Sequence, residues 1–485
     1  MIIIRFIALL WFVVFTFNSV AETSVVDVGA HQTLKDSFIK HYNASDFNAL
    51  YSMASEPYKQ RVDEQEFVAW LQESRNRCGA IKSSQLTDDL DSVKYFALKG
   101  EQQTVRLELS AASATQFNDV NLVVLNRNSG SVLASSNPRR SALEKQVDTA
   151  LQNLRRDPRT VGFSVGIYYQ KKSYLFHYGT TEHDKAILPT NNTRYEIASI
   201  SKTFTGTLLA QAVVEKKLTL EDDVRTYLAG DYNNLVFDGE PIRIKHLLNH
   251  RSGLPLIFPD EPMIFADQNY EQIPYRIIAA RTGYTRERFL TDLRAFKLTA
   301  KPGNQFRYSN VSADLAALIL EQLYQKPFTQ LLSEKLFVPL RMKNSELQVV
   351  QVEHPQLAFG YNEKAKVMPR NIGIIGADGS IRSTAEDLLR YLRYHLDERD
   401  PAVRVSHTAT YGALPRYAVG LNWQMKTDWR NTRQLWQSGG SFGFSSYATL
   451  IPEQGLAIAI LSNESDPQAQ QRLESAAREI YHRLR

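Results

Sequence analysis

Ser199 and Lys202 are the two side chains whose types and spacing most directly suggest chemistry in this sequence. A serine hydroxyl is a weak nucleophile until a base removes its proton, and a lysine three residues further along a helix lies on the same face, one turn on. The apolar spacing of Phe204, Leu208 and Val213 predicts such a helix. We therefore expect Lys202 to reach Ser199. With Ser199 in the first turn of the helix, its own N–H would supply half of an oxyanion hole.

A short motif of this kind also arises by chance, so it needs partners elsewhere in the chain. Tyr308-Ser309-Asn310 follows the turn Lys301-Pro302-Gly303 and supplies two of them. A phenol held near Lys202 can lose its proton and shuttle protons between Ser199, the leaving group and water. Asn310 is expected to orient Lys202 and to hydrogen-bond a carbonyl or amide of the substrate.

A third candidate segment is Gln437-Ser438-Gly439-Gly440, at the end of an expected strand. The small residues Gly439 and Gly440 would let a substrate lie against the backbone of this strand, and the Gly440 N–H could complete the oxyanion hole begun by Ser199. We expect Gln437 and Ser438 to contact the substrate as well.

Together these motifs resemble those of serine hydrolases of the class C β-lactamase, D,D-peptidase and related esterase type, in which Tyr308-Ser309-Asn310 corresponds to the second motif. The segments His246–Pro255, Val338–Met342 and Ser383–Asp387 are also similar to segments of this family. The resemblance covers residues 141–485. It implies a β-lactamase/transpeptidase-like α+β domain, with an antiparallel sheet flanked by helices plus a helical region, and a reaction through an acyl-enzyme on Ser199 without cofactor or metal.

The third segment departs from the family pattern, which has Lys-Thr-Gly or His-x-Gly where this sequence has Gln437-Ser438-Gly439. Charge-assisted hydrogen bonds are about twice as strong as neutral ones, so loss of the basic residue weakens recognition of a substrate carboxylate. Neutral ester or amide substrates are therefore favoured, unless Arg307 or Arg382 supplies the charge.

Two alternatives stay open at this point. One is a β-lactamase or D,D-carboxypeptidase proper, acting on D-amino-acid peptides or β-lactams. The other is a protein that binds peptidoglycan fragments or β-lactams without hydrolysing them. Retention of Ser199, Lys202, Tyr308 and Asn310 favours an enzyme, because a pure binding protein needs no matched nucleophile and base.

Two further features have a structural and a functional interpretation. His246 and His250 have a spacing that occurs in metal sites, but no Glu lies between them and no third ligand is evident, so we expect structural roles. The aromatic segment between Leu256 and Arg288 is either a surface insertion packed on itself or a lid over the substrate pocket.

The N-terminus predicts export of the chain. Arg5 precedes the apolar run Phe6–Phe17, and small residues end at Ala21, as in a signal peptide spanning residues 1–21. The mature protein would then be periplasmic or secreted, without a membrane span; an uncleaved anchor is the alternative. A single cysteine, Cys78, excludes an intrachain disulfide.

A length of 485 residues suggests more than one domain. Residues 25–127 show helical spacing followed by short alternating runs at 93–98, 104–109 and 120–125, which predicts a small α+β accessory domain that resembles NTF2-like domains. The polar stretch 128–140 predicts a linker. In the hydrolase domain, residues 141–485, the expected strands 162–169, 173–178, 445–451 and 456–461 would bring the first and last elements onto one antiparallel sheet.

The net charge of +5 is small for this length, and no stripe of Lys and Arg with interleaved aromatic residues is present, which argues against nucleic-acid binding. The expected partner is a small-molecule or peptide substrate, with cell-wall fragments among the candidates.

Overall fold

The computed structural model describes residues 28–90, 92–125, 132–266, 271–348 and 354–485. The expected signal peptide lies outside these ranges. Within them, no helix is both long and apolar enough to cross a bilayer.

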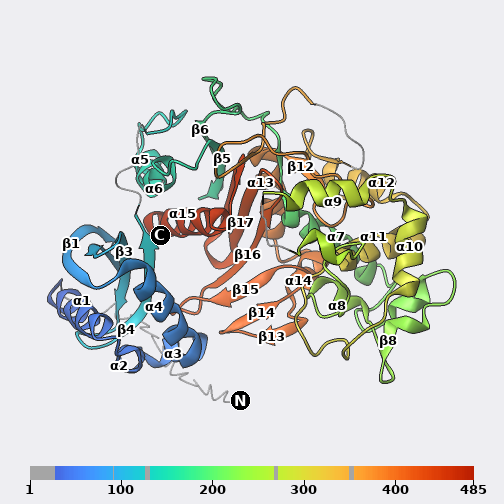
Figure 1. The fold of residues 1–485 in the computed structure, drawn as a ribbon. Helices are drawn as coiled ribbons and strands as arrows, with labels where there is room; N and C mark the ends of the chain where they lie inside the picture. The colour runs from blue at the N-terminus through green and yellow to red at the C-terminus, as the bar shows by residue number, and fades with distance from the viewer. Residues whose placement is uncertain (1–27, 91, 126–131, 267–270, 349–353) are drawn as a thin grey trace, which may run out of the picture.

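The N-terminal part of the chain forms a unit of four helices followed by a four-stranded antiparallel sheet, at the left of Figure 1. The elements are α1 (Val28–Asn43), α2 (Phe47–Ser52), α3 (Glu56–Arg61), α4 (Glu64–Cys78), β1 (Ile81–Leu90), β2 (Val93–Gly100), β3 (Thr104–Ala111) and β4 (Phe117–Val124). The strands pair in chain order, and the helices pack an apolar core against them. The expected α+β order is confirmed, with α3 and the edge strand β1 as additions.

The rest of the chain is built on an eight-stranded antiparallel sheet in the order β13-β14-β15-β16-β17-β18-β5-β6. Its strands are β5 (Gly162–Tyr169), β6 (Lys172–Gly179), β13 (Tyr411–Ala413), β14 (Tyr417–Val419), β15 (Gln424–Thr427), β16 (Arg433–Gly440), β17 (Ser445–Ile451) and β18 (Leu456–Ser462). Because β18 pairs with β5, the first and last strands of this part lie side by side, as the sequence predicted.

Helices cover both faces of this sheet (Figure 1). One face packs against α5 (Ala142–Ala150), α6 (Gln152–Arg155) and the terminal helix α15 (Ala469–Leu484), with an apolar core between them. Residues 142–155 form two helices, α5 and α6, that are divided at Leu151. The opposite face carries the larger core and contacts α13 (Ala385–His395).

A helical region lies beside the sheet, at the right of Figure 1. It contains α7 (Ser201–Val214), α8 (Ile244–Leu248), α9 (Ile273–Arg281), α10 (Arg286–Ala295), α11 (Asn310–Tyr324), α12 (Phe328–Leu332) and α14 (Pro401–His407). Helix α7 is buried on nearly every side, which explains why its apolar residues do not form a single stripe.

The stretch expected to be a linker is ordered where the structure describes it. Ser135 bridges to Tyr178, and the Ser136 N–H donates to the His177 carbonyl at 2.9 Å, so residues 135–136 run along the edge strand β6.

Charged contacts join the N-terminal unit to α15. Arg106 pairs with Glu479 at 2.5 Å, and the Arg478 Nε donates to Glu108 at 3.0 Å.

Candidate active site

The site is organised around Ser199, which lies in the short turn η1 (Ala198–Ile200) immediately before α7. The sequence placed Ser199 in the first helical turn; the structure places it in a 3₁₀ turn instead, after Ala198 with a left-handed φ of 47°. Lys202 is fully buried in the first turn of α7. Its Nζ donates to the Ser199 Oγ at 3.1 Å, so the expected contact is present.

Tyr308 completes a triangle with these two residues. Its hydroxyl lies 2.6 Å from the Ser199 Oγ, and the Lys202 Nζ lies 5.0 Å from the centre of its ring. Tyr308 is held just before α11, because Ser309 caps this helix by accepting from the Ser312 N–H at 3.0 Å. The structure thus brings together a serine hydroxyl, a phenol that can exchange a proton with it, and the amine of Lys202.

Asn310 occupies the first position of α11 and faces a cavity that Ser199 also lines. Its Oδ1 is buried without a hydrogen-bond partner in the described part of the chain. The expectation that Asn310 orients Lys202 is not met: the second hydrogen bond of the Lys202 Nζ goes to the main-chain carbonyl of Asp378. The Asn310 Oδ1 is therefore an acceptor still open to a hydrogen bond.

The strand β16 ends against the nucleophile. A Cβ placed on Gly439 would come within 2.4 Å of the Ile197 carbonyl oxygen and 2.9 Å of the Ser199 nitrogen, so only glycine permits this approach. Gly440 lines both cavities at Ser199, and Ser438 lines one of them. Ser199 and Gly440 therefore border the same two cavities, where an oxyanion hole would need both of their N–H groups.

On one side of Ser199 lies a cavity of about 350 Å³, which we name the amide cavity. Five side-chain amides line it, those of Asn249, Asn422, Gln424, Gln437 and Gln470. The Gln437 Nε2 donates to the Asn422 carbonyl at 2.9 Å, and its Oε1 accepts from the Gln424 Nε2 at 3.2 Å. The third motif of the family has a basic residue at this position. Here the position holds Gln437, a neutral amide whose hydrogen bonds go to Asn422 and Gln424.

His250 also lines the amide cavity and lies 4.2 Å from the Tyr308 ring, centroid to centroid. Its Nδ1 accepts from the Ser309 N–H at 3.3 Å, which leaves Nε2 as the protonated nitrogen of the neutral ring. Burial and the nearby Lys202 ammonium lower the pKa of His250 to about 3. Tyr308 therefore packs on an uncharged imidazole.

The opposite side of Ser199 opens into a cavity of about 250 Å³, which we name the apolar cavity. Leu256, Ile257, Phe265 and Ile277 line it, so the segment 256–288 walls the site where the structure describes it. Its Tyr270 lies outside the described residues. This arrangement supports the lid interpretation over a surface insertion packed only on itself.

Arg281, at the end of α9, is the cation that borders the apolar cavity. Its Nη2 lies 3.2 Å from Asp378, whose carbonyl holds Lys202. Asp314 accepts from the Asp378 N–H at 3.2 Å, and burial together with the Asp378 charge raises the pKa of Asp314 well above its usual range. Arg281 thus offsets the charge of these acids next to the carbonyl that holds Lys202.

Neither arginine proposed from the sequence to bind a substrate carboxylate lines the two cavities. Arg382 is buried and pairs with Glu196 at 3.8 Å. Arg307 donates to the Gly253 carbonyl at 3.0 Å. Arg382 lies on the buried strand β12 (Ile381–Ser383), and neither arginine is placed at Gln437 to supply the charge.

The two spaced histidines have separate surroundings. His246 accepts from the Arg243 N–H at 3.2 Å, and the described ranges contain no cluster of three or more His, Cys, Asp or Glu side chains suited to a metal ion. His250, interpreted from sequence as structural, belongs to the site. The Asp378 carbonyl and Asn422 were also missed, because neither belongs to a motif near Ser199 in the sequence.

Comparison with known proteins identifies the family of this domain. Residues 147–482 match the family model described as Beta-lactamase, which is more than half of the chain. The chain belongs to this family. Beta-lactamases of Pseudomonas fluorescens and Providencia stuartii are each 26% identical to it, over 369 and 362 residues, which cover 68% and 67% of this chain and 95% and 88% of the relatives.

Solved structures of β-lactamase-family proteins share the fold. A class C β-lactamase superposes with a TM-score of 0.59 at 22% identity, covering 71% of this chain and 97% of that structure. A β-lactamase/D-alanine carboxypeptidase from Pseudomonas syringae superposes with a TM-score of 0.59 at 21% identity, covering 70% of this chain and 99% of that structure. The β-lactamase/transpeptidase-like fold expected for residues 141–485 is therefore confirmed.

Proposed function

We propose that this β-lactamase-family protein is a serine hydrolase that cleaves an ester or amide through an acyl-enzyme on Ser199. The observation that carries the proposal is the triangle in which the Ser199 Oγ lies 2.6 Å from the Tyr308 hydroxyl and 3.1 Å from the Lys202 Nζ. Nucleophile and base are already within hydrogen-bond reach.

In the first half-reaction, the Ser199 Oγ attacks the substrate carbonyl while its one proton passes to the Tyr308 oxygen, with Lys202 beside them as the second member of the base pair, and Tyr308 then gives that proton to the leaving group. The Ser199 and Gly440 N–H groups stabilise the oxyanion. Water, deprotonated by the same pair, releases the acyl group in the second half-reaction. The two cavities at Ser199 give the acyl and leaving groups separate places.

The amide cavity supports a neutral substrate on the side of Gln437. Gln437 is 5% exposed and donates to the carbonyl and the side chain of Asn422, at 2.9 and 3.2 Å. An amide committed in this way offers a carboxylate neither charge nor a spare donor, and the donor that is left, the Asn422 Nδ2, buried without a partner in the described residues, is also neutral.

The second candidate is a β-lactamase or D,D-carboxypeptidase, favoured by the names of the relatives and by Arg281 at the apolar cavity. Hydrolysis of a fluorescent penicillin and of a short-chain activated ester, each with Ser199→Ala as control, distinguishes the two. Ester turnover without penicillin turnover supports the first candidate. A stable Ser199 adduct with no turnover of either compound would support a binding protein instead.

We also propose that the chain is exported and cleaved after Ala21, since Arg5 and the apolar run after it have the composition of a signal peptide. The mature protein would act in the periplasm or outside the cell, with its NTF2-like unit as an accessory domain. The N-terminal sequence of the protein recovered from an expressing bacterium tests this: a chain that starts at Glu22 supports cleavage after Ala21, and one that starts at Met1 contradicts that cleavage.

A further inference from the structure

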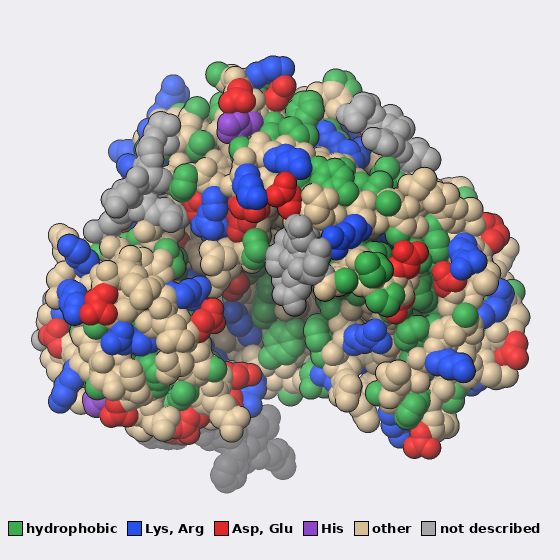
Figure 2. Space-filling view, viewed as in Figure 1, with side chains coloured by type: hydrophobic (Ala, Val, Ile, Leu, Met, Phe, Trp, Pro, Cys, Tyr) green, Lys and Arg blue, Asp and Glu red, His purple; other side chains and the backbone are tan. Residues whose placement is uncertain are grey.

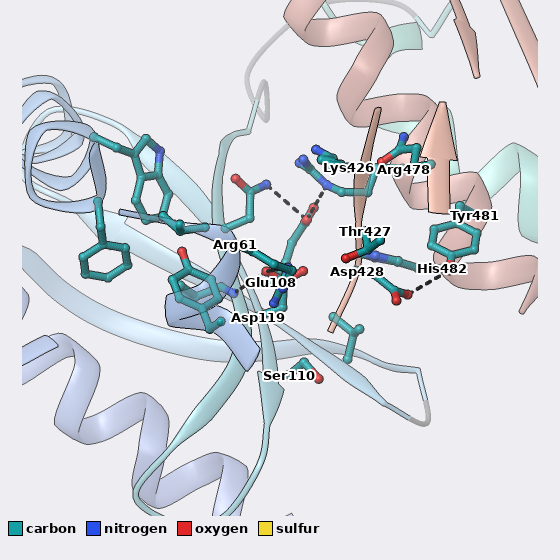
Figure 3. Close-up of a pocket in the computed structure, with 18 of the residues that line it drawn as sticks. Arg61, Glu108, Ser110, Asp119, Lys426, Thr427, Asp428, Arg478, Tyr481 and His482 are labelled. Carbon is teal, nitrogen blue, oxygen red and sulfur yellow. Dashed lines mark hydrogen bonds and ion pairs between the residues drawn. The ribbon is translucent and has the colours of Figure 1, made fainter. Parts of the chain in front are cut away.

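Charged side chains of both signs are spread over the surface of the molecule (Figure 2). Some charges are buried together instead. At the contact between the N-terminal unit and α15, each acid can meet a guanidinium directly, as Glu108 does by accepting from the Arg478 Nε at 3.0 Å (Figure 3). Another buried group lies next to Ser199 and consists of two cations and two acids, Lys202, Arg281, Asp314 and Asp378.

In this second group, Lys202 is held by a neutral acceptor. Its Nζ donates to the Ser199 Oγ at 3.1 Å and to the main-chain carbonyl of Asp378, and the described residues place no carboxylate in an ion pair with it. The position of a carbonyl is set by the peptide chain that carries it. The place of the Lys202 ammonium beside Ser199 therefore depends on what holds the main chain at Asp378.

The main chain at Asp378 is held on several sides. Its N–H donates to the Asp314 carboxylate at 3.2 Å, and the Ser380 N–H closes the turn by donating to the Gly376 carbonyl at 3.1 Å. The Asp378 side chain accepts from the Ser380 Oγ at 3.4 Å and from the Arg281 Nη2 at 3.2 Å. Among these partners, only Arg281 carries a positive charge.

The charge of Arg281 matters because two acids are buried side by side. The Asp378 side chain is 4% exposed, and Asp314 is also buried. Burial and the Asp378 charge raise the pKa of Asp314, whereas the charges of Arg281 and Lys202 oppose that rise. A buried carboxylate that loses its cation is strongly destabilised. Because Asp378 lines the apolar cavity, its side chain would then turn toward the water there and draw its main chain along.

Arg281 has a second role that must be separated from this one. It is the last residue of α9, in which only Pro274 is fully buried, and its Nη1 donates to the Ile372 carbonyl at 3.4 Å. Arg281 therefore also anchors α9, which walls the apolar cavity through Ile277. Loosening of this wall would change substrate binding, whereas displacement of Lys202 would change the chemical step.

We propose that Arg281 is a positioning residue for Lys202. Through the Asp378 side chain, it fixes the main-chain carbonyl that holds the Lys202 ammonium beside Ser199. The proposal rests on the proposed function, because Lys202 belongs to the base pair of that reaction.

The test is steady-state hydrolysis of 4-nitrophenyl acetate by the full chain. Arg281→Met should lower kcat by about 10–100-fold with little change in KM, because displacement of a reacting group by about 1 Å can cost about 10²-fold. Arg281→Lys keeps the charge and should lose less. Arg276→Met is the matched control on the same helix, because the Arg276 Nη1 donates to the carbonyls of Met263 and Ile264, at 3.4 Å each, and not to Asp378. Its kcat should stay close to that of the unchanged protein.

A double variant, Arg281→Met with Asp378→Asn, separates the two roles of Arg281. Asparagine removes the charge that Arg281 offsets and keeps the main-chain carbonyl. Most of the kcat lost in Arg281→Met should therefore return, and the melting temperature should rise above that of Arg281→Met. If Arg281 only anchors α9, Asp378→Asn restores nothing, and Arg281→Met raises KM instead.

The proposal is overturned if Arg281→Met leaves kcat unchanged, if it changes KM alone, or if Asp378→Asn restores no activity to it. Ser199→Ala tests the proposed function separately. Equal hydrolysis by the unchanged protein and Ser199→Ala would refute the proposed function and this proposal with it. Hydrolysis that depends on Ser199 but is unaffected by Arg281→Met would overturn this proposal alone.

Discussion

Tyr308→Phe tests whether the Tyr308 hydroxyl transfers the proton of Ser199 or merely lies near it. The change removes a single oxygen, the one that lies 2.6 Å from the Ser199 Oγ, and keeps the ring that packs on His250 at 4.2 Å. General acid–base catalysis by one side chain contributes about 10²–10⁴-fold, so kcat/KM should fall by that factor. The loss corresponds to about 3–5 kcal/mol of transition-state stabilisation.

The fold should tolerate this change. Net loss of one hydrogen bond costs about 1 kcal/mol of unfolding free energy, far less than the catalytic effect. Tyr417→Phe is the matched control, because Tyr417 lines the same amide cavity but its hydroxyl donates to Gln424 at 3.2 Å instead of to Ser199.

The assay is hydrolysis of an activated short-chain ester at equal concentrations of the three proteins, with thermal unfolding measured alongside. Tyr308→Phe should lose activity by at least a hundredfold, and Tyr417→Phe should stay within about tenfold of the unchanged protein. If Tyr308→Phe keeps activity within tenfold, or if both variants lose equally, Tyr308 is not the proton carrier.

Three further outcomes are expected. Gln437→Lys restores a cation beside Asn422 and should raise penicillin turnover relative to ester turnover; an unchanged ratio would refute the role given to Gln437. Gly439→Ala puts a Cβ within 2.9 Å of the Ser199 nitrogen, and displacement of about 1 Å should lower kcat by about 10²-fold, which steady-state kinetics would detect. Because the pKa of His250 is lowered to about 3 from a usual value near 6.5, protonation favours the unfolded chain. The contribution of neutral, buried His250 to the free energy of unfolding is complete above pH 6.5 and falls by about 1.4 kcal/mol per pH unit down to about pH 3. Denaturant unfolding of His250→Gln should show a shallower decline over that range than His183→Gln, which alters an exposed histidine; equal slopes would contradict the burial of a neutral ring.

The strands that the sequence predicted lie in both sheets and are those whose side chains are mostly buried. Strands β5 and β17 begin and end at the residues that the sequence predicted, 162–169 and 445–451. Strand β1 was missed because its ten residues are mostly exposed and polar, and its pairing with β2 runs through the backbone. Helix α3 was missed because six residues are too few for a periodic pattern to show.

Some residues of the site could be predicted from the sequence and others could not. Ser199 and Lys202 could be found from helical spacing, and Tyr308 from its motif and the turn before it. The acceptor that holds Lys202 is the main-chain carbonyl of Asp378. Every residue has such a carbonyl, so the sequence could not identify it. The amide cavity assembles Asn249, Gln424 and Gln470 from a loop, a strand and the last helix, and only the fold brings these together.

The measurement that tests the central claim most directly is intact-protein mass spectrometry of the chain after brief exposure to an activated ester and, separately, to a fluorescent penicillin, with peptide mapping of any adduct. The account predicts an acyl group on Ser199 with at least one of the two compounds, and none in Ser199→Ala. An acyl group on another residue, or an adduct of unchanged yield in Ser199→Ala, would contradict it.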